Sequence, residues 1–394
     1  MDKGKLIKIF GPAWLVMIAD MDASSIIGAA QTGAMFNYGF VWLLLLLIIP
    51  LYIVQEASAR IGVVTRKGIG TMIRERYGKK LAMLMAFPMA LTDVVTYVAE
   101  FIGIAVGLEI LGVPSYYGIP LAFVVYLAIV TRKSYKYIEI ALLSISGILI
   151  FGLIATLLLR GIQPYSPFFF SSSPHYLFLL AANIGAVVMP FMIFFQASAT
   201  AIKLNGEKSR KPKDAILRQE RRNTLIGAVV TELLMVVVEM TFAGSGANNP
   251  AIFVYPKELS FVMTPIAGPF AEYIFGIGLL GAGFLALSVV ALGSAWGVAE
   301  AANIRNKKAI YIAESLPAAI ASMLIPQAEL IKAVLYLLVF FVFTLVGPVV
   351  MLGLIAQNKS ILGKYRTGKI GNIIYWLSAA ILIFLATIAV AEVI

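Results

Sequence analysis

Long apolar segments recur along the whole chain and are separated by short polar connections. Most of these segments reach the length of about 20 residues that an α-helix needs to cross the hydrocarbon core of a bilayer. We therefore predict an all-α integral membrane protein with eleven transmembrane helices and no soluble domain. The predicted spans cover residues 11–33, 39–64, 81–111, 116–131, 137–160, 175–202, 224–245, 266–299, 309–325, 330–357 and 371–393.

Two of these spans are interrupted near their middle. The first contains Asp22-Ala23-Ser24-Ser25, and the sixth contains Met189-Pro190. The sixth span comes five spans after the first, an odd number, so the two enter the membrane from opposite sides. This pattern predicts an inverted five-plus-five repeat with broken first helices. The single transmembrane domain, 1–394, would then comprise a first repeat of about 11–160, a second of about 175–357 and an extra helix of about 371–393.

Composition supports a membrane protein, because 61% of the residues are hydrophobic and only 13% are charged. The net charge of +11 does not indicate nucleic acid binding, since the basic residues lie in short loops between spans. Placing the N-terminus in the cytoplasm puts most of these loops inside, so we predict a cytoplasmic N-terminus and an outside C-terminus. The first apolar run is too long and too polar for a cleaved signal sequence. The absence of cysteine excludes disulfides and thiolate metal ligands.

Asp22 is the first candidate for metal binding, because it lies about a dozen residues into the first span. A charged side chain at the bilayer centre costs several kcal/mol unless it is paired or lines water. Ser24 and Ser25 form helices poorly, so the helix can unwind here and expose backbone carbonyls beside the carboxylate. The alternative is a carboxylate satisfied by nearby hydroxyl groups as part of the packing.

Met189 is the second candidate. Pro190 removes a backbone hydrogen bond and frees a carbonyl one turn earlier, near Ala186. A lone methionine in an apolar helix usually belongs to the core, but here it adjoins a break that matches the break in the first span. A thioether is a soft ligand, and beside a carboxylate and carbonyls it favours Mn or Fe over Mg or Ca.

Four further acidic residues lie within predicted spans. Asp93 and Glu100 are seven positions apart in the third span, and Glu232 and Glu239 are seven apart in the seventh, so each pair shares a helix face. Few basic residues lie inside the spans to pair with them. These acids could form a proton or cation path, or they could be neutral, hydrogen-bonded acids between packed helices.

Other polar residues have simpler interpretations. Glu56 and Arg60 are four apart and predict an intrahelical ion pair. His175, the only histidine, is expected at an interfacial or N-cap position rather than as a ligand. In the basic loop between the sixth and seventh spans, which we predict to be cytoplasmic, we expect a short surface helix at about 214–222. The chain has no Walker motif, nucleophile elbow, HExxH or redox motif, so we expect neither an enzyme nor an ATP-driven pump, and no cofactor.

Several segments, taken in order, resemble the Nramp family of divalent-metal transporters. The clearest are GPAWLVMIADMDASS at 11–25, QEASARIGVVTRKGIGTMIRERYG at 55–78 and GAVVMPFMIFFQAS at 185–198. The resemblance implies a LeuT-like fold with a metal site between helices 1 and 6. It implies a metal-binding carboxylate at Asp22, a carbonyl ligand at Ala186 and a sulfur ligand at Met189. Ser25 stands where the family has a metal-binding Asn, and Glu100 matches a family acid associated with proton movement.

The sequence also departs from the family pattern. Ala23-Ser24 replaces Pro-Gly, Phe191 replaces the His that follows Met-Pro, and Tyr97 replaces an acid three residues before Glu100. Phe284 replaces a Gln of helix 8. Several of these changes remove groups that the family uses for proton coupling or for completing the metal shell. The resemblance therefore implies the metal site but leaves proton coupling open.

These observations favour a transporter of divalent metal ions of the Mn/Fe type that works by alternating access. One alternative is an Nramp-related, uncoupled transporter of magnesium or another divalent cation. A second is an ion-coupled carrier of an amino acid or another organic solute, and a third is a non-transporting membrane receptor or subunit. We expect a prokaryotic plasma membrane location, with the lipid bilayer, the metal substrate and, in a coupled transporter, protons as partners.

Overall fold

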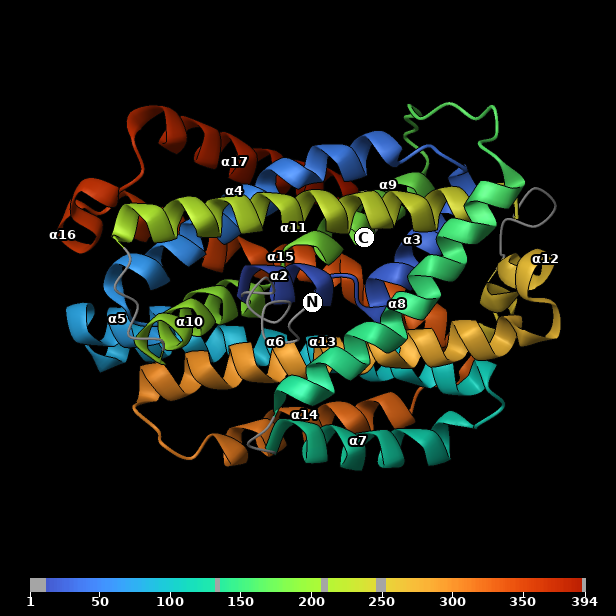
Figure 1. Ribbon diagram of the computed structural model, residues 1–394, viewed down its shortest axis with the longest axis horizontal. Helices are drawn as coiled ribbons and strands as arrows, with labels where there is room; N and C mark the ends of the chain where they lie inside the picture. Colours follow the sequence, from blue (N-terminus) through green and yellow to red (C-terminus); the bar gives the residue numbers. More distant parts are fainter. Residues whose placement is uncertain (1–11, 132–134, 207–211, 246–252, 392–394) are drawn as a thin grey trace.

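The computed structural model describes residues 12–131, 135–206, 212–245 and 253–391, and these residues form helices and connecting loops without a strand (Figure 1). The α-helices are α2 Pro12–Ala19, α3 Ala23–Phe36, α4 Val41–Thr65, α5 Ile69–Tyr77, α6 Lys79–Ile110, α7 Ser115–Thr131, α8 Tyr135–Arg160, α9 Pro174–Val187, α10 Pro190–Gly206, α11 Lys213–Phe242, α12 Thr264–Ala267, α13 Ala271–Ala302, α14 Lys307–Met323, α15 Leu330–Gln357, α16 Lys359–Leu362 and α17 Lys369–Ala391. The 3₁₀-helices are η1 Pro256–Met263, η2 Gly268–Phe270, η3 Gln327–Glu329 and η4 Gly363–Tyr365.

Each predicted span coincides with one helix or with the two halves of a broken helix. Within the described residues, 7 helices are long and apolar enough to cross a membrane, and up to 9 if each bent pair counts as one span. The pair α2 and α3 bends by 49° at its break. The remaining two predicted spans are α7 and α14, each with 17 residues. At 1.5 Å per residue they reach about 26 Å, the lower end of the length that spans a bilayer.

The predicted surface helix at 214–222 is not a separate element. Residues Lys213–Phe242 form one continuous helix, α11, which includes both this segment and the seventh span. No proline or glycine lies between Asp214 and Arg222, so nothing in the sequence ends the helix before the apolar part begins. The polar segment is therefore an extension of the span.

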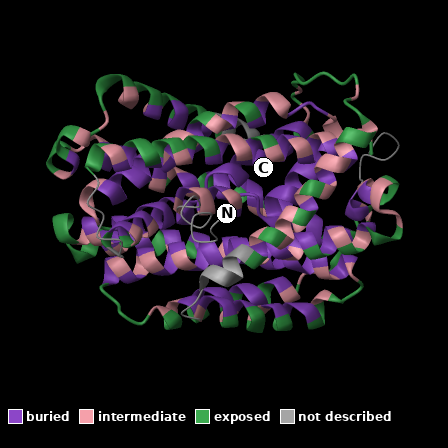
Figure 2. Ribbon diagram, in the orientation of Figure 1, coloured by how far each residue is buried: buried purple, intermediate pink, exposed green. Residues whose placement is uncertain are grey.

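Buried residues run through the centre of the helix assembly, and exposed residues occupy its outer faces (Figure 2). Many of the exposed side chains are large and apolar, such as Leu84 at 64% and Phe151 at 74%. A water-soluble protein rarely exposes so many large apolar residues together. Hydrocarbon around the helices accounts for this surface and agrees with the predicted integral membrane protein.

The two broken helices pack against each other in an antiparallel way. The half-helix α2 contacts α10, and α3 contacts α9. A hydrogen bond of 2.9 Å from Asn183 Nδ2 to Thr32 Oγ1 ties α9 to α3. Because each half-helix lies beside the opposite half of the other span, the two breaks lie side by side in the centre of the protein (Figure 1).

Small residues let two long helices approach the first break closely. A methyl group added at Gly103 of α6 would lie 2.5 Å from the Ala23 side chain, and one at Gly283 of α13 would lie 3.6 Å from it. Larger residues at these positions would push α6 or α13 away from the first turn of α3. The close approach at Gly103 therefore lets α6 place Glu100 beside the break.

Two simpler predictions are confirmed. Arg60 and Glu56 form an ion pair of 3.1 Å, and Glu56 also accepts a hydrogen bond of 2.8 Å from Arg221. His175 is exposed in the first turn of α9, where Ser173 is the N-cap and accepts a hydrogen bond from Tyr176 N. The only histidine therefore lies at a helix end, as expected.

Candidate metal site

Asp22 produces the break in the first span by capping its second half. Its backbone is extended, and its Oδ1 accepts a hydrogen bond of 2.6 Å from the Ser25 backbone amide. Aspartate is among the most favoured N-cap residues, and the positive end of the helix dipole favours a negative charge there. The side chain is only 1% exposed, so a carboxylate is held at a helix N-terminus inside the protein.

Ser24 connects Asp22 with Glu100 of α6. Its Oγ lies 2.8 Å from Asp22 Oδ1 and 3.0 Å from Glu100 Oε1. A serine hydroxyl has one proton, so it donates fully to only one carboxylate at a time. Ser24 Oγ hydrogen-bonds to both groups at once only when one of the two carboxyl groups is protonated. The hydroxyl then donates to the deprotonated group and accepts from the protonated one. The sequence analysis had proposed roles for Asp22 and Glu100, but it missed this bridge because it joins residues 76 positions apart.

The second break supplies other ligand types. Helix α9 ends at Val187, Val188 is extended, and α10 begins at Pro190. Because Pro190 has no amide hydrogen, the Ala186 carbonyl lacks its usual partner four residues later. Met189 is fully buried, and its backbone amide donates to Met192 Sδ at 3.4 Å.

The four predicted metal ligands lie in or beside the two breaks, whose half-helices contact each other, α2 with α10 and α3 with α9. The Ser25 Oγ is buried and lies near the Asp22 carboxyl group. The carbonyl of Ala186 and the sulfur of Met189 come from the facing break. No set of three or more His, Cys, Asp or Glu side chains converges in the described ranges, so a metal here would need carbonyl, hydroxyl and thioether ligands beside Asp22.

The structure adds an acidic residue that the sequence analysis missed. Asp20 is buried between α2 and α3, and its carboxyl group lies within electrostatic range of Glu232 and Asp22. Its Oδ1 has no hydrogen-bond partner among the described residues, and neither does Glu232 Oε2. The sequence Asp20-Met21-Asp22 in an apolar span could have revealed this second acid. Of the predicted path residues, Glu100 is therefore linked to Asp22 through Ser24, and Glu232 lies near Asp20.

The other two predicted path residues lie elsewhere. Glu239 accepts a hydrogen bond of 2.8 Å from the Phe40 amide at the start of α4, and it neighbours Gly33 near the far end of α3. Asp93 does not join Glu100 in a common cluster, although both lie on α6. Instead it lies with Glu314 of α14.

Three positions that depart from the family pattern carry aromatic side chains, and one of them, Tyr97, lies near the carboxyl groups of Asp93 and Glu314. The Tyr97 hydroxyl lies 3.2 Å from the Tyr126 hydroxyl, and neither ring is exposed. Phe191 is buried in the first turn of α10, and Phe284 is half-buried on α13. No carboxyl or imidazole group is present at these three positions to take a proton from Glu100 or Asp22.

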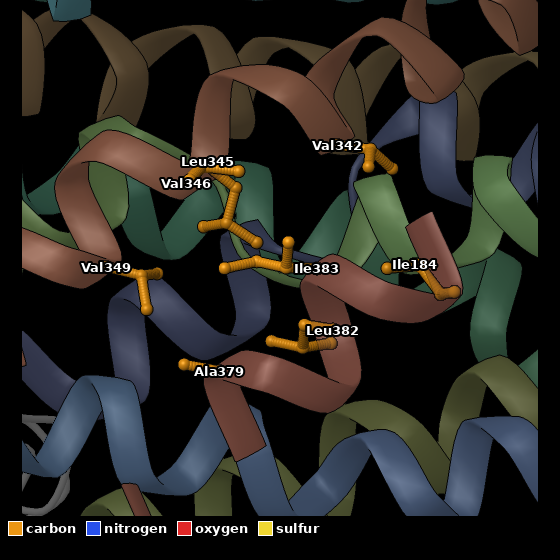
Figure 3. A pocket seen from close by; sticks show the side chains of 8 residues that line it. All are labelled: Ile184, Val342, Leu345, Val346, Val349, Ala379, Leu382 and Ile383. Carbon is orange, nitrogen blue, oxygen red and sulfur yellow. The ribbon is translucent and has the colours of Figure 1, made fainter. Parts of the chain in front are cut away.

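One enclosed cavity can be set aside as a metal site. It measures about 10 Å³ and is lined only by aliphatic side chains of α9, α15 and α17 (Figure 3). A space of this size is at the limit for a single water molecule, and a water or ion would find no polar partner there. Asp22 and the other predicted metal ligands lie at the breaks, away from this cavity.

Comparison with known proteins identifies relatives of this chain. The model of the natural resistance-associated macrophage protein-like family, Nramp, matches residues 13–392. The divalent metal cation transporter MntH of Bacillus subtilis is 27% identical over 98% of this chain and 92% of its own length. MntH of Levilactobacillus brevis is 24% identical over 95% of this chain and 87% of its own.

Solved structures show the same fold. The Eremococcus coleocola manganese transporter superposes with a TM-score of 0.80 at 16% identity, covering 98% of this chain and 86% of that one. MhsT in complex with L-phenylalanine superposes with a TM-score of 0.62 at 16% identity, covering 98% of both chains. The fold is therefore LeuT-like. Because the family model matches nearly the whole chain, this protein belongs to the Nramp family.

Proposed function

We propose that this protein transports divalent metal ions across the membrane by alternating access. The observation that carries the proposal is Asp22, a buried carboxylate at a helix N-terminus, in a break that faces a second break at Met189-Pro190. Relatives of similar length are named as divalent metal cation transporters. The α2–α3 and α9–α10 pairs would rock against the remaining helices and open the site to one side at a time.

The proposed ligand set is mixed. Asp22 supplies the negative charge, Ser25 a hydroxyl, Ala186 a free carbonyl and Met189 a thioether. The soft sulfur favours Mn or Fe over Mg and Ca. Glu100, linked to Asp22 through Ser24, and Glu232, near Asp20, add negative charge beside the ion.

We also propose how the chain is organised in the membrane. The two repeats would comprise about 11–160 and about 175–357, followed by the extra helix at about 371–393. The basic loops favour a cytoplasmic N-terminus and an outside C-terminus. The bacterial relatives support a prokaryotic plasma membrane as the location.

Metal transport should proceed without a coupled proton flux. A proton held between Asp22 and Glu100 has no carboxyl or imidazole group to move to at Tyr97 or Phe191. Purified protein in liposomes that contain a metal-sensitive dye and a pH dye should therefore show Mn²⁺ entry without internal acidification. Acidification that requires Mn²⁺ and disappears when Asp22 is replaced would contradict this prediction.

The same liposomes distinguish the alternative functions. Mn²⁺ entering faster than Mg²⁺ and Ca²⁺ is the expected result. Equal or faster Mg²⁺ entry would favour the uncoupled magnesium transporter. Inhibition of Mn²⁺ entry by amino acids would favour an organic-solute carrier.

The Ser24 bridge should strengthen metal binding by fixing the orientation of the Asp22 carboxylate. Ser24→Ala removes hydrogen bonds to two carboxyl groups, and a net loss of about 1 kcal/mol corresponds to roughly fivefold weaker apparent affinity for Mn²⁺. Ser288→Ala is the matched control, because that buried hydroxyl donates only to the Phe284 carbonyl of its own helix. Uptake titrations that give the same Mn²⁺ affinity for both variants would show that the bridge does not support the site.

A further inference from the structure

A second group of buried acidic side chains lies between α6, α13 and α14, three helices that pack on one another. Asp93 is 0% exposed, and Glu314 is 6% exposed. Ser294 of α13 donates a hydrogen bond of 3.0 Å to Glu314 Oε1, and the same hydroxyl lies near the Asp93 carboxyl group. Asp93 also lies near the backbone amide of Phe191, in the first turn of α10.

The carboxyl groups of this cluster are incompletely paired. The Oε2 of Glu314 lacks a hydrogen-bond partner among the described residues, and so do both carboxyl oxygens of Asp93 apart from the nearby Ser294 hydroxyl and Phe191 amide. Neither residue takes part in an ion pair within the described part of the chain. Buried polar groups without partners are uncommon in folded proteins, so these incompletely paired oxygens in one cluster indicate a missing partner.

The surroundings of the cluster provide oxygen atoms but no positive charge. Tyr97 of α6, Tyr126 of α7 and Tyr311 of α14 all lie within electrostatic range of Glu314. Carboxyl and hydroxyl oxygens are hard ligands and suit Mg²⁺ or Ca²⁺ rather than soft metals. When both carboxyl groups are deprotonated they carry two negative charges, which one divalent cation would neutralise.

We propose that Asp93, Glu314 and Ser294 form a second cation site, which takes a hard divalent cation. This site is separate from the one at Asp22, because Asp93 lies seven residues before Glu100 on α6, or about 10 Å along the helix. A cation here would hold α6, α13 and α14 together beside the first turn of α10. The proposal does not depend on transport through the Asp22 site.

Calorimetry with Mg²⁺ on the purified full-length protein tests this proposal. Asp22→Ala removes the carboxylate of the first site, and this variant should keep one saturable Mg²⁺ site. Adding Asp93→Asn or Glu314→Gln to Asp22→Ala should weaken the remaining Mg²⁺ binding by at least about tenfold, since each removes a charged ligand. Adding Glu109→Gln instead should leave it unchanged, because that α6 carboxyl group already accepts a hydrogen bond of 2.6 Å from Ser115 N.

Several outcomes would overturn the proposal. One is an Asp22→Ala protein that binds no Mg²⁺. This result would indicate that Asp93 and Glu314 are neutral acids without a bound cation. Another is Mg²⁺ binding that persists in both double variants, which would place the cation near Asp20 and Glu232. Saturable binding of Na⁺ but not Mg²⁺, with choline as the control cation, would exclude a divalent site. An Asp22→Ala protein that binds no Mg²⁺ overturns the proposal even if a double variant does not fold.

Discussion

Replacing Asp22 by alanine is expected to abolish Mn²⁺ uptake into liposomes that contain the purified protein. Asp22 is the anionic member of a proposed ligand set that otherwise consists of neutral oxygen and sulfur atoms. Removing the charged partner from a buried ionic contact typically costs about 3–5 kcal/mol, or roughly two to four orders of magnitude in affinity. At micromolar Mn²⁺ the initial rate of dye quenching should fall to that of empty liposomes.

The same substitution also removes a helix cap, and two controls separate the effects. Ser173→Ala removes the N-cap of α9, whose hydroxyl accepts from Tyr176 N at 3.3 Å, without removing a charge. Losing such a cap costs about 1 kcal/mol, which should leave folding and uptake largely intact. Asp22→Asn keeps a capping side chain but removes the charge, so it should be as inactive as Asp22→Ala. Normal uptake by Asp22→Asn would show that the carboxylate is not the metal ligand.

The fold could be predicted from sequence because its main determinants are local. Length and apolar composition identify the spans, and both breaks contain residues that interrupt a helix, Asp22 with its serines and Pro190. The predicted helix at 214–222 is present, but it does not end before the seventh span and continues into it as α11. A polar segment without proline or glycine can continue a helix beyond the membrane, as α11 does.

The arrangement of the acidic residues could be predicted only in part. Asp22 could be chosen as a candidate metal ligand from the sequence alone, because a carboxylate in the middle of the membrane is costly unless it is paired or lines water. Helical spacing placed Asp93 and Glu100 on one face of α6, yet Glu100 contacts Ser24 while Asp93 lies near Glu314. Ser24 belongs to α3 and Glu314 to α14. The way these helices, distant in sequence, pack against α6 decides which of them each acidic side chain contacts. Periodicity within one helix carries no information about that register.

Replacing Met189 by alanine is expected to lower the preference for Mn²⁺ over Mg²⁺ by about tenfold or more, or at least 1.4 kcal/mol. The thioether is the soft ligand in the proposed set, so its loss should weaken Mn²⁺ binding and leave Mg²⁺ binding nearly unchanged. The ratio of Mn²⁺ and Mg²⁺ uptake rates in the same liposome preparation measures this preference directly. The change should appear as slower Mn²⁺ uptake rather than faster Mg²⁺ uptake.

Met192→Ala is the matched control for this experiment. Met192 is equally buried in the first turn of α10, and its sulfur already accepts a hydrogen bond from the Met189 amide. Both substitutions remove the same side-chain volume from the same region, so a packing defect should affect the two variants alike. A lower Mn²⁺ preference in Met189→Ala alone supports direct contact between the sulfur and the metal. An unchanged ratio in Met189→Ala would remove the sulfur from the ligand set and leave a site of oxygen ligands only, which is the chemistry of a magnesium transporter.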